Sequence, residues 1–164
     1  MNKSTISKKI LFWYDNNKRI LPWRKNTSKE QKLYLTLVSE FMLQQTQVST
    51  VIPYFKRFVQ KIPNFKKLSK ANDQTLMKLW EGLGYYSRAR NLKKSAIMIN
   101  GKFGGILPSN FEDLKFLPGV GDYTSTAIMA IAFNQKFIPL DGNVERILKR
   151  VLFLRSDKDI SKEN

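Results

Sequence analysis

Hydrophobic residues recur along this chain at the spacing of one face of an α-helix. The longest apolar stretch covers residues 33–55 and contains a single charged side chain, that of Glu40. Within this stretch the pattern predicts a buried helix from about Leu33 to Gln47. The stretch is long enough to raise a transmembrane interpretation, but the consecutive polar residues 44–47 argue against one.

The same periodicity predicts further helices before and after this stretch. The first helix of the chain should have an apolar face made of Ile6, Ile10, Trp13 and Tyr14. Pro53 fits the start of a helix, and Gly101 fits the position just past the end of one. Ser109 and Glu112 form a capping-box pattern for a short helix. No convincing alternating strand pattern occurs, so we predict an all-α bundle of about eight or nine helices.

Composition limits the partners and the chemistry open to this helical chain. A length of 164 residues is typical of one domain, and 42% hydrophobic residues can form a substantial core. The net charge of +16 suits a polyanion, most simply nucleic acid, or else an anionic membrane surface. The sequence has no Cys and no His, which excludes disulfides and thiolate or imidazole metal sites. The N-terminus also lacks the continuous apolar core of a signal peptide.

Glu40 is the first candidate for chemistry, because a lone carboxylate on an apolar helix is costly unless it has a purpose. Desolvation favours the neutral acid and raises its pKa, and a raised carboxyl pKa is what a general acid needs near neutral pH. The alternative is a glutamate at the edge of the core that reaches solvent or pairs with an arginine. From this stretch alone, both interpretations stay open.

A glycine-containing turn at residues 117–121 (LPGVG) separates two predicted helices, the second running from about Asp122 to Phe133. Gly119 and Gly121 let the backbone turn tightly and approach a ligand closely. Amide groups at the start of a helix favour an anion, which in a basic protein is most simply a DNA phosphate. The glycine pattern alone fits a plain αα-hairpin better; the net charge and the flanking residues favour phosphate binding.

Aromatic and basic residues follow a second glycine turn at residues 84–91 (GYYSRARN). Tyr85 and Arg88 in this setting suit stacking on bases and holding a nucleic-acid backbone. Two tyrosines at the edge of the core, followed by solvated arginines, would give the same sequence. The stretch alone therefore supports both interpretations equally.

Asp141 is the second carboxylate of interest, because it directly precedes the last predicted helix. The helix N-terminus should keep this carboxylate ionised, although a simple N-cap is the commoner reason for an aspartate there. Set against Glu40, it gives one carboxyl that should hold its proton and one that should lose it. Such a pair is typical of glycoside chemistry, but the sequence cannot show that the two face each other.

Four segments of the chain follow one another in an order shared with a known family. They are residues 39–55 (SEFMLQQTQVSTVIPYF), 79–92 (LWEGLGYYSRARNL), 117–128 (LPGVGDYTSTAI) and 138–148 (IPLDGNVERIL). From about Trp13 to Leu154 the chain resembles the MutY-like adenine DNA glycosylases of the helix-hairpin-helix superfamily. The MLQQTQV and GLGYYSRARN segments are specific to MutY-like enzymes, whereas LPGVG alone indicates only the superfamily.

The resemblance implies a helix-hairpin-helix glycosylase fold and a monofunctional enzyme of base excision repair. Its partner would be double-stranded DNA in which adenine is mispaired with 8-oxoguanine or guanine, and the adenine would be flipped out of the duplex. Glu40 matches the acid that protonates adenine at N7. Asp141 matches the aspartate that stabilises the oxocarbenium-like sugar. Arg24 lies where the family approaches the adenine pocket.

The resemblance also assigns residues that contact DNA. Gln45 and Tyr85 match residues that intercalate beside the mispair, and Arg88 belongs to the same DNA-binding segment. Gly119, Val120 and Gly121 match the phosphate-binding hairpin. Tyr123 occupies the active-site position at which endonuclease III-like relatives carry a Schiff-base lysine, so we expect hydrolysis without a lyase step.

Two features depart from the family. Its members usually hold a 4Fe-4S cluster with four cysteines near the end of the catalytic region, and they read 8-oxoguanine with a C-terminal domain. This chain has no cysteine, so we expect no metal or cofactor within it. We interpret residues 1–164 as a single helical catalytic region, truncated before the iron-sulfur segment. We expect a monomer in the bacterial cytoplasm, associated with the nucleoid and not with a membrane.

Other functions remain open at this point. An endonuclease III-like glycosylase with lyase activity would have the same fold. A non-catalytic helix-hairpin-helix module would bind DNA in a way that does not depend on Glu40, but it would leave the buried carboxylate without a reason.

Overall fold

The computed structural model describes residues 3–152, and over this range the chain forms α-helices and one short 3-10 helix without any strand. In chain order the elements are α1 (Lys3–Asn17), η1 (Pro22–Arg24), α2 (Lys29–Leu43), α3 (Val48–Lys61), α4 (Phe65–Ser69), α5 (Asp73–Trp80), α6 (Ser87–Lys102), α7 (Phe111–Lys115), α8 (Asp122–Ile131) and α9 (Gly142–Leu152). The predicted all-α fold is confirmed. None of the described helices combines the length and apolarity needed to cross a membrane.

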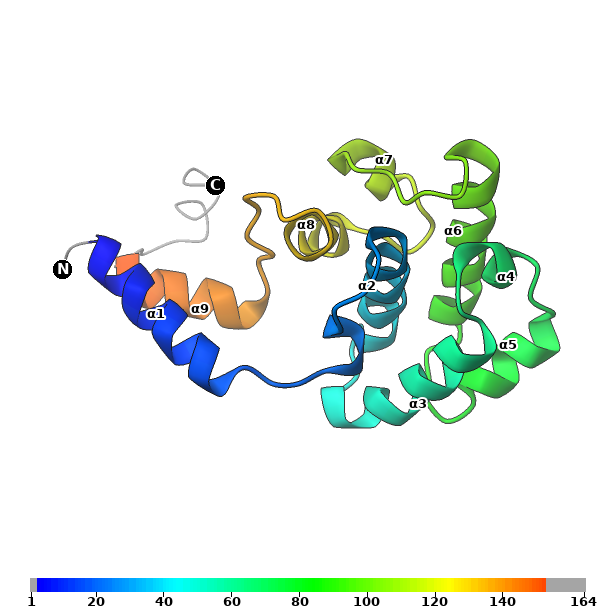
Figure 1. Cartoon of the computed structure of the whole chain (residues 1–164), viewed down its shortest axis with the longest axis horizontal. Helices are drawn as coiled ribbons and strands as arrows, with labels where there is room; N and C mark the ends of the chain where they lie inside the picture. The colour runs from blue at the N-terminus through cyan, green and yellow to red at the C-terminus, as the bar shows by residue number, and fades with distance from the viewer. Residues whose placement is uncertain (1–2, 153–164) are drawn as a thin grey trace.

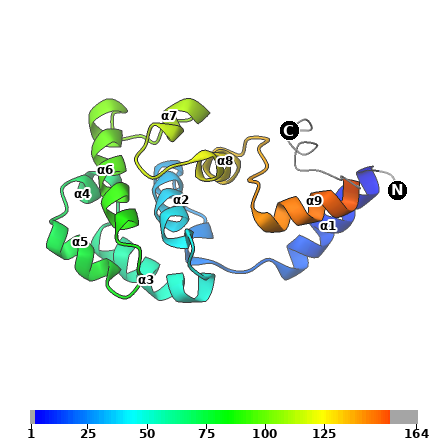
Figure 2. The same cartoon turned by 180° about the vertical axis from the view of Figure 1, so that it is seen from behind.

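Helix α2 forms the centre of the fold. It packs against η1, α3, α6 and α8, so neighbours surround it (Figure 1), and the view from behind shows the same arrangement (Figure 2). Its residues Leu37, Val38 and Phe41 are completely buried. Because apolar side chains occur on almost every side of this helix, neighbouring helices can enclose it.

The bounds of α2 differ from the predicted range of residues 33–47. The helix begins four residues earlier because Ser28 caps it, accepting a hydrogen bond from the Gln31 N–H at 3.2 Å. It ends at Leu43 because Gln45 takes a left-handed backbone conformation, with φ of 55°, which an α-helix cannot continue. The polar segment that follows α2 is therefore a loop.

Two other sequence expectations about helix ends were wrong. Pro53 lies inside α3, which already begins at Val48, directly after the loop. Gly101 lies within the last turn of α6, and the left-handed positions fall instead on Gly104 and Gly105. At Gly105 the N–H donates to the Ile99 carbonyl at 2.9 Å and so satisfies one of the free carbonyls of the helix end.

The short helix α7 is also capped by a different residue from the one predicted. Asn110, and not Ser109, occupies the N-cap, where its side-chain oxygen accepts a hydrogen bond from the Asp113 N–H at 2.8 Å. Ser109 lies one residue too early for this role. Helix α4 was not predicted at all, since its five residues are too few to show a periodic pattern.

The elements from η1 to α8, residues 21–135, form a packed unit that we call the helical body. Edge-to-face pairs of aromatic rings join its helices, for example Trp23 with Phe55 at 5.2 Å and Phe58 with Trp80 at 6.0 Å between centroids. The buried apolar side chains of the body form a single cluster. The packing of this cluster holds the residues at the surface of the body in fixed positions.

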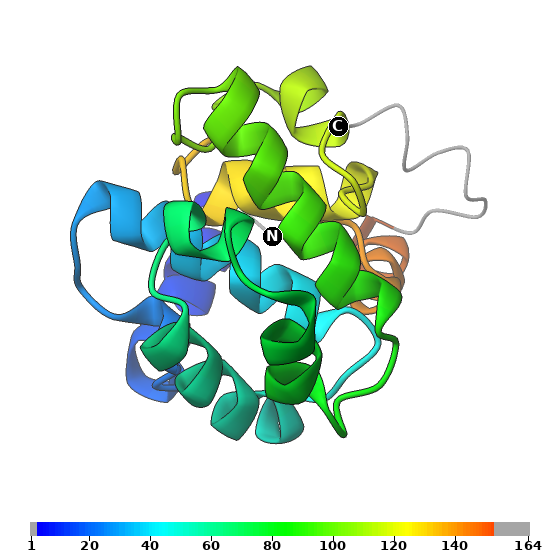
Figure 3. The ribbon, with the colours of Figure 1, turned by 90° about the vertical axis from the view of Figure 1, so that its right-hand side faces the viewer.

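Helices α1 and α9, which we call the end helices, lie beyond α8 at the opposite end of the molecule from α5 (Figure 1). They overlap in Figures 1 and 2, whereas Figure 3 places most of α1 and α9 on different sides of the molecule. Neither packs extensively against another described element, and α9 has no buried residue. Apolar side chains such as Trp13 and Ile147 are more than half exposed.

Candidate active site

The Glu40 side chain lies in the last turn of α2, at the edge of the core. Burial raises the pKa of its carboxyl to about 7, because the charged form loses its hydration. The positive charge of Arg24 acts in the opposite direction and lowers the pKa, but less strongly. The sequence left open whether Glu40 is paired or desolvated, and the structure shows that desolvation dominates. A carboxyl with this pKa can hold a proton at neutral pH.

Tyr123 connects Glu40 with Asp141. Tyr123 is the second residue of α8, and the pKa of its phenol is raised by partial burial and then by the negative charges of Glu40 and Asp141. Both carboxyl groups therefore lie close enough to the phenol to affect its ionisation, since such effects fade quickly with distance. Helix α2, helix α8 and the start of α9 thus bring three residues that are distant in the sequence to one place.

Asp141 also has the simpler role that its sequence position allowed. Its Oδ1 atom accepts hydrogen bonds from the N–H groups of Asn143 at 3.0 Å and Val144 at 2.7 Å, in the first turn of α9. These bonds satisfy two of the N–H groups that have no partner within the first turn of α9. Capping and a role at the site are compatible, because each carboxylate has several lone pairs to offer.

Arg24 is held near Glu40 by its neighbour in η1. Trp23 is buried against the Phe55 ring, which anchors this short helix on the body. The exposed Arg24 guanidinium donates a long hydrogen bond of 3.5 Å to the Tyr14 hydroxyl, and its charge reaches Glu40. The position expected from the family resemblance is therefore close to the acid, as an active-site residue would be.

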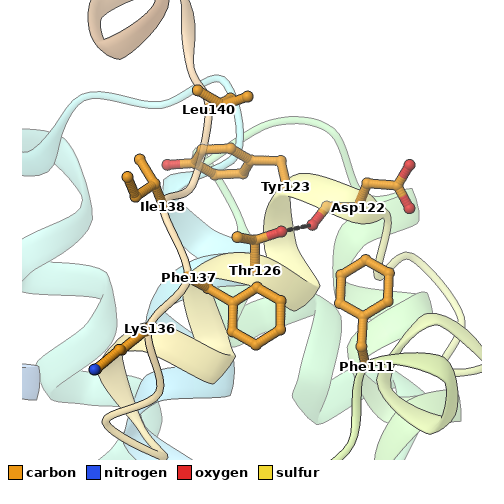
Figure 4. Close-up of a pocket in the computed structure, with 8 residues that line it drawn as sticks. All are labelled: Phe111, Asp122, Tyr123, Thr126, Lys136, Phe137, Ile138 and Leu140. Carbon is orange, nitrogen blue, oxygen red and sulfur yellow. Dashed lines mark hydrogen bonds between the residues drawn. The ribbon is translucent and has the colours of Figure 1, made fainter. Parts of the chain in front are cut away.

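A pocket of about 520 Å³ borders this cluster, between the α7–α8 hairpin and the segment that leads to α9 (Figure 4). Tyr123 and Leu140 line one part of it, and the stacked rings of Phe111 and Phe137, 6.0 Å apart, line another. Glu40 is not among its lining residues. Of Glu40, Tyr123 and Asp141, only Tyr123 lines this cavity.

The predicted hairpin forms from α7, the turn at residues 117–121 and α8. Gly119 has φ of 81°, and a Cβ atom there would come within 2.9 Å of both Phe41 and Asn91. Val120 is buried, while Gly121 is exposed and forms the N-cap of α8. Because the first N–H groups of a helix have no partner within it, the start of α8 has the geometry of an anion site.

Gln45 and Tyr85, the residues predicted to intercalate, share an unusual conformation. Both side chains are exposed, and both residues have positive φ values, 55° and 48°. Left-handed backbone is uncommon for residues other than glycine, and it persists only where the surroundings impose it. The structure thus presents the two side chains from tight, strained turns.

Arg88 does not lie where the sequence prediction placed it. Its side chain is only 6% exposed, and its guanidinium donates to backbone carbonyls of the body and not to solvent. A DNA contact by Arg88 does not fit this position, and the expectation of a solvated arginine was equally wrong. The sequence could not reveal this, because a buried and an exposed arginine look alike in a segment with two arginines.

Gln44 is a residue that the sequence interpretation missed. Its side-chain amide donates to the Gly119 carbonyl at 3.2 Å and to the Thr124 hydroxyl at 3.4 Å. It therefore connects the end of α2 with the hairpin. Its place beside Gln45 was the only available signal, and nothing in the sequence separates the two glutamines by role.

The chain can be assigned to a protein superfamily by its similarity to known families. A family description, HhH-GPD superfamily base excision DNA repair protein, matches residues 38–164. The chain belongs to this superfamily. The matched range includes α2 from Val38 onward, the glycine turn at residues 81–86, the α7–α8 hairpin and Asp141. These parts form the candidate site.

This HhH-GPD chain is similar to proteins named adenine DNA glycosylase. It is 47% identical to the one from Rattus norvegicus over 94% of its own length, and 43% identical to the one from Buchnera aphidicola subsp. Acyrthosiphon pisum over 99%. The human protein of the same name is 46% identical over 90% of the chain. The chain spans 31%, 47% and 28% of the lengths of these three relatives.

Solved structures agree on the fold. A thermostable thymine-DNA glycosylase has a TM-score of 0.79 and 28% identity, covering 89% of this chain and 66% of that one. A non-covalent endonuclease III–DNA complex has a TM-score of 0.74 and 24% identity, covering 96% of this chain and 72% of the other. These likenesses confirm the predicted helix-hairpin-helix glycosylase fold.

An iron-sulfur cluster does not fit the residues of this HhH-GPD chain. Such a cluster is held by cysteine thiolates, and the sequence contains no Cys and no His. Within residues 3–152, moreover, no three potential metal-ligating side chains gather in one place.

Proposed function

We propose that this chain is the catalytic portion of a monofunctional DNA glycosylase that removes adenine mispaired with 8-oxoguanine or guanine. The main support is the environment of Glu40, a carboxyl whose pKa is raised to about 7 beside Tyr123 and Asp141. The similarity to adenine DNA glycosylases over most of the chain supports adenine as the base. The identity of the opposite base is inferred from the family resemblance.

In the first step, the neutral Glu40 carboxyl donates its proton to N7 of the flipped adenine. The bond between C1′ of the sugar and N9 of adenine then breaks, and its electron pair leaves with the base. Protonation makes adenine a better leaving group, which is how general acids accelerate such reactions. The partly buried position of Glu40 suits this role because it keeps the proton available at neutral pH.

The second step uses the other carboxylate. Loss of the base leaves an oxocarbenium-like sugar, and the negative charge of Asp141 stabilises it electrostatically. Glu40, now ionised, accepts a proton from water as the water oxygen forms a bond with C1′. The sum of both steps is adenine, an abasic sugar and an intact strand. Tyr123, whose phenol is affected by the charges of both carboxyl groups, would help to position the sugar.

The lyase alternative would need an amine that attacks C1′ and forms a Schiff base. Tyr123 stands where lysine-bearing relatives carry that amine, and a phenol cannot form a Schiff base. A non-catalytic DNA-binding module would not need a carboxyl with a raised pKa near a second carboxylate. We therefore favour base hydrolysis over both alternatives.

The proposed partner is double-stranded DNA containing the mispair. A net charge of +16 and the start of α8 after the hairpin both favour contacts with phosphates. The same net charge opposes self-association, which supports a monomer.

The decisive experiment measures adenine release under single-turnover conditions from a duplex with adenine opposite 8-oxoguanine. The wild-type chain should release adenine, and Glu40→Gln should slow release by about 10²–10⁴-fold, because the shape is kept while the proton is lost. Duplex affinity, measured by gel shift, should stay unchanged.

Glu112→Gln is the matched control, since it removes an exposed carboxylate from α7. It should release adenine at the wild-type rate. Failure of the wild-type chain to release adenine, or equal rates for wild type and Glu40→Gln, would refute the proposed function.

A further inference from the structure

Three loops of the body carry the residues proposed to contact DNA, and they come from separate parts of the sequence. The first is the α2–α3 loop with Gln45, the second is the glycine turn at residues 81–86 with Tyr85, and the third is the hairpin turn at residues 117–121. If these loops are to engage one duplex together, something must fix their relative positions.

Arg88 connects the first two loops. Its Nη1 atom donates to the carbonyls of Met42 at 2.9 Å, Phe41 at 3.2 Å and Gln44, all at the end of α2. Its Nη2 atom donates to the carbonyls of Leu83 at 3.3 Å and Gly84 at 3.2 Å, in the glycine turn. Each of the two terminal guanidinium nitrogens thus donates hydrogen bonds to a different loop.

Gln44 extends this connection to the third loop. Its backbone carbonyl accepts from Arg88, while its side-chain amide donates to the Gly119 carbonyl in the hairpin turn at 3.2 Å. The same amide also reaches the Thr124 hydroxyl in α8 at 3.4 Å. A chain of hydrogen bonds therefore runs from the glycine turn through Arg88 and Gln44 to the hairpin.

The carbonyls held by Arg88 include the two that precede the strained residues. The Gln44 carbonyl belongs to the peptide group that leads into Gln45, and the Gly84 carbonyl belongs to the one that leads into Tyr85. Both following residues are left-handed, a conformation that costs free energy for a non-glycine residue. Arg88 thus acts directly on the two peptide groups whose orientation sets these side chains.

We propose that Arg88 is a positioning residue that, together with Gln44, holds the three DNA-facing loops in one arrangement, so that Gln45 and Tyr85 enter the base stack together. This proposal rests on the proposed function, because it assumes that these loops contact DNA. It assigns Arg88 no contact with DNA. The loops remain the parts that read the duplex, and Arg88 sets the distance between them.

The chemistry of arginine suits this task. A buried cation is costly unless it is paired, and here backbone carbonyl oxygens accept from both terminal nitrogens of Arg88, while its buried Nε has no partner among the described residues. The rings of Trp80 and Tyr85, with centroids 5.6 Å and 5.3 Å from the guanidinium carbon, add further stabilisation. The planar guanidinium can donate in two directions at once, whereas a lysine ammonium is a single point charge on a flexible stem.

The test compares Arg88→Met, Arg88→Lys and the control Lys94→Met in the whole chain. Lys94→Met removes the same charge from an exposed position of the same helix. Two quantities are measured. The first is hydrogen exchange of the Thr46 and Leu83 amides, which donate to the Leu43 and Trp80 carbonyls within the two loops that Arg88 connects. The second is the ratio of dissociation constants for a fully paired duplex and the same duplex with one A·8-oxoguanine pair. Circular dichroism checks that every variant is folded.

In Arg88→Met we expect exchange at Thr46 and Leu83 to become at least about tenfold faster, since the two loops lose the charge-assisted hydrogen bonds that hold them together. The preference for the mispaired duplex should fall by about tenfold, because small misplacements of contacting groups are costly. Arg88→Lys should keep the charge but rescue neither quantity fully. Lys94→Met should match the wild type in both.

Two results would overturn the proposal. Unchanged exchange at Thr46 and Leu83 in a folded Arg88→Met would show that Arg88 does not hold the loops. Faster exchange with an unchanged preference for the mispair would show that the hydrogen bonds only stabilise the body. If the wild type itself had no preference for the mispaired duplex, the proposed function would fail, and the exchange comparison would still decide whether Arg88 holds the loops.

Discussion

The helical body and the end helices each contribute one carboxylate to the site, but under very different conditions. Glu40 belongs to α2, where residues on almost every side are buried, and its pKa is raised to about 7. Asp141 stands at the start of α9, a helix without a buried residue, and receives backbone hydrogen bonds. The proposed acid depends on packing, whereas the proposed stabilising carboxylate needs only a helix start.

This difference has a physical reason. Keeping a carboxyl neutral requires a surrounding region that excludes water, and only a close-packed core provides one. Keeping a carboxylate charged requires N–H groups and solvent, which the first turn of an otherwise exposed helix can offer. A neutral carboxyl therefore suits the packed part of the chain, and a charged carboxylate suits the exposed part.

The largest expected effect concerns the packing of the body. Leu37 is completely buried in α2, one turn before Glu40. Leu37→Ala should lower the free energy of unfolding by about 2–5 kcal/mol, because it leaves a cavity in the core. Urea denaturation followed by circular dichroism measures this. A loss below about 1 kcal/mol would mean that the core around Glu40 is not close-packed.

A smaller effect is expected from removing the charge of Asp141, at the start of the exposed helix α9. Asp141→Asn keeps an oxygen that can cap α9, since asparagine caps helices as well as aspartate does. It removes the negative charge near the sugar and should slow adenine release by about a hundredfold, the typical effect of losing one electrostatic contact in a transition state. Thermal unfolding should be unchanged. Release at the wild-type rate would exclude the charge of Asp141 from the mechanism.

The raised pKa of Glu40 also predicts how stability varies with pH. Its pKa in the folded chain is about 7, against 4.5 for an ordinary glutamate carboxyl, so the folded state binds the proton more tightly. The stability it contributes is fully present below about pH 4.5 and is lost as the pH rises through 7. One pKa unit corresponds to about 1.4 kcal/mol, so the wild type should lose about 2 kcal/mol between pH 5 and pH 8 from this group.

Glu40→Gln removes this dependence. Urea titrations of both proteins at pH 5 and pH 8 should show that the substitution stabilises the chain at pH 8 relative to the wild type. Parallel pH profiles for the two proteins would mean that Glu40 is well hydrated in the folded state.

The smallest expected effect belongs to the end helices. Ile147 is 55% exposed on α9, so Ile147→Ala should change the free energy of unfolding by less than about 0.5 kcal/mol. Set beside Leu37→Ala, it measures how much less this helix contributes to the folded state. A loss similar to that of Leu37→Ala would show that α9 is packed in solution. This result would contradict the difference in packing between the helical body and the end helices.

Much of the fold and of the candidate site could be predicted from the sequence, because hydrophobic periodicity can be recognised without knowledge of tertiary contacts. The helix around Glu40, the hairpin and the cap at Asp141 all depend on local patterns. The raised pKa of Glu40 was predictable for a related reason, since a single charge within an apolar stretch must be desolvated when that stretch is buried.

What the sequence could not show depends on contacts between distant residues. Arg88 is buried because the end of α2 places carbonyls opposite its guanidinium, and no local pattern records that. Pro53 lies inside α3 because the preceding loop ends earlier than the proline suggested. The joint effect of Glu40 and Asp141 on Tyr123 requires three elements to meet, which only the fold determines.

The fit of Gly119 against Phe41 has a consequence for inheritance. Every amino acid that one nucleotide change can put in place of a glycine has a Cβ atom, and at this position such an atom would come within 2.9 Å of the Phe41 ring. Because Phe41 follows Glu40 directly in α2, the new side chain would push the hairpin away from the helix that carries the acid. Missense alleles at codon 119 should therefore behave as loss-of-function alleles, even though none of them alters a reacting group.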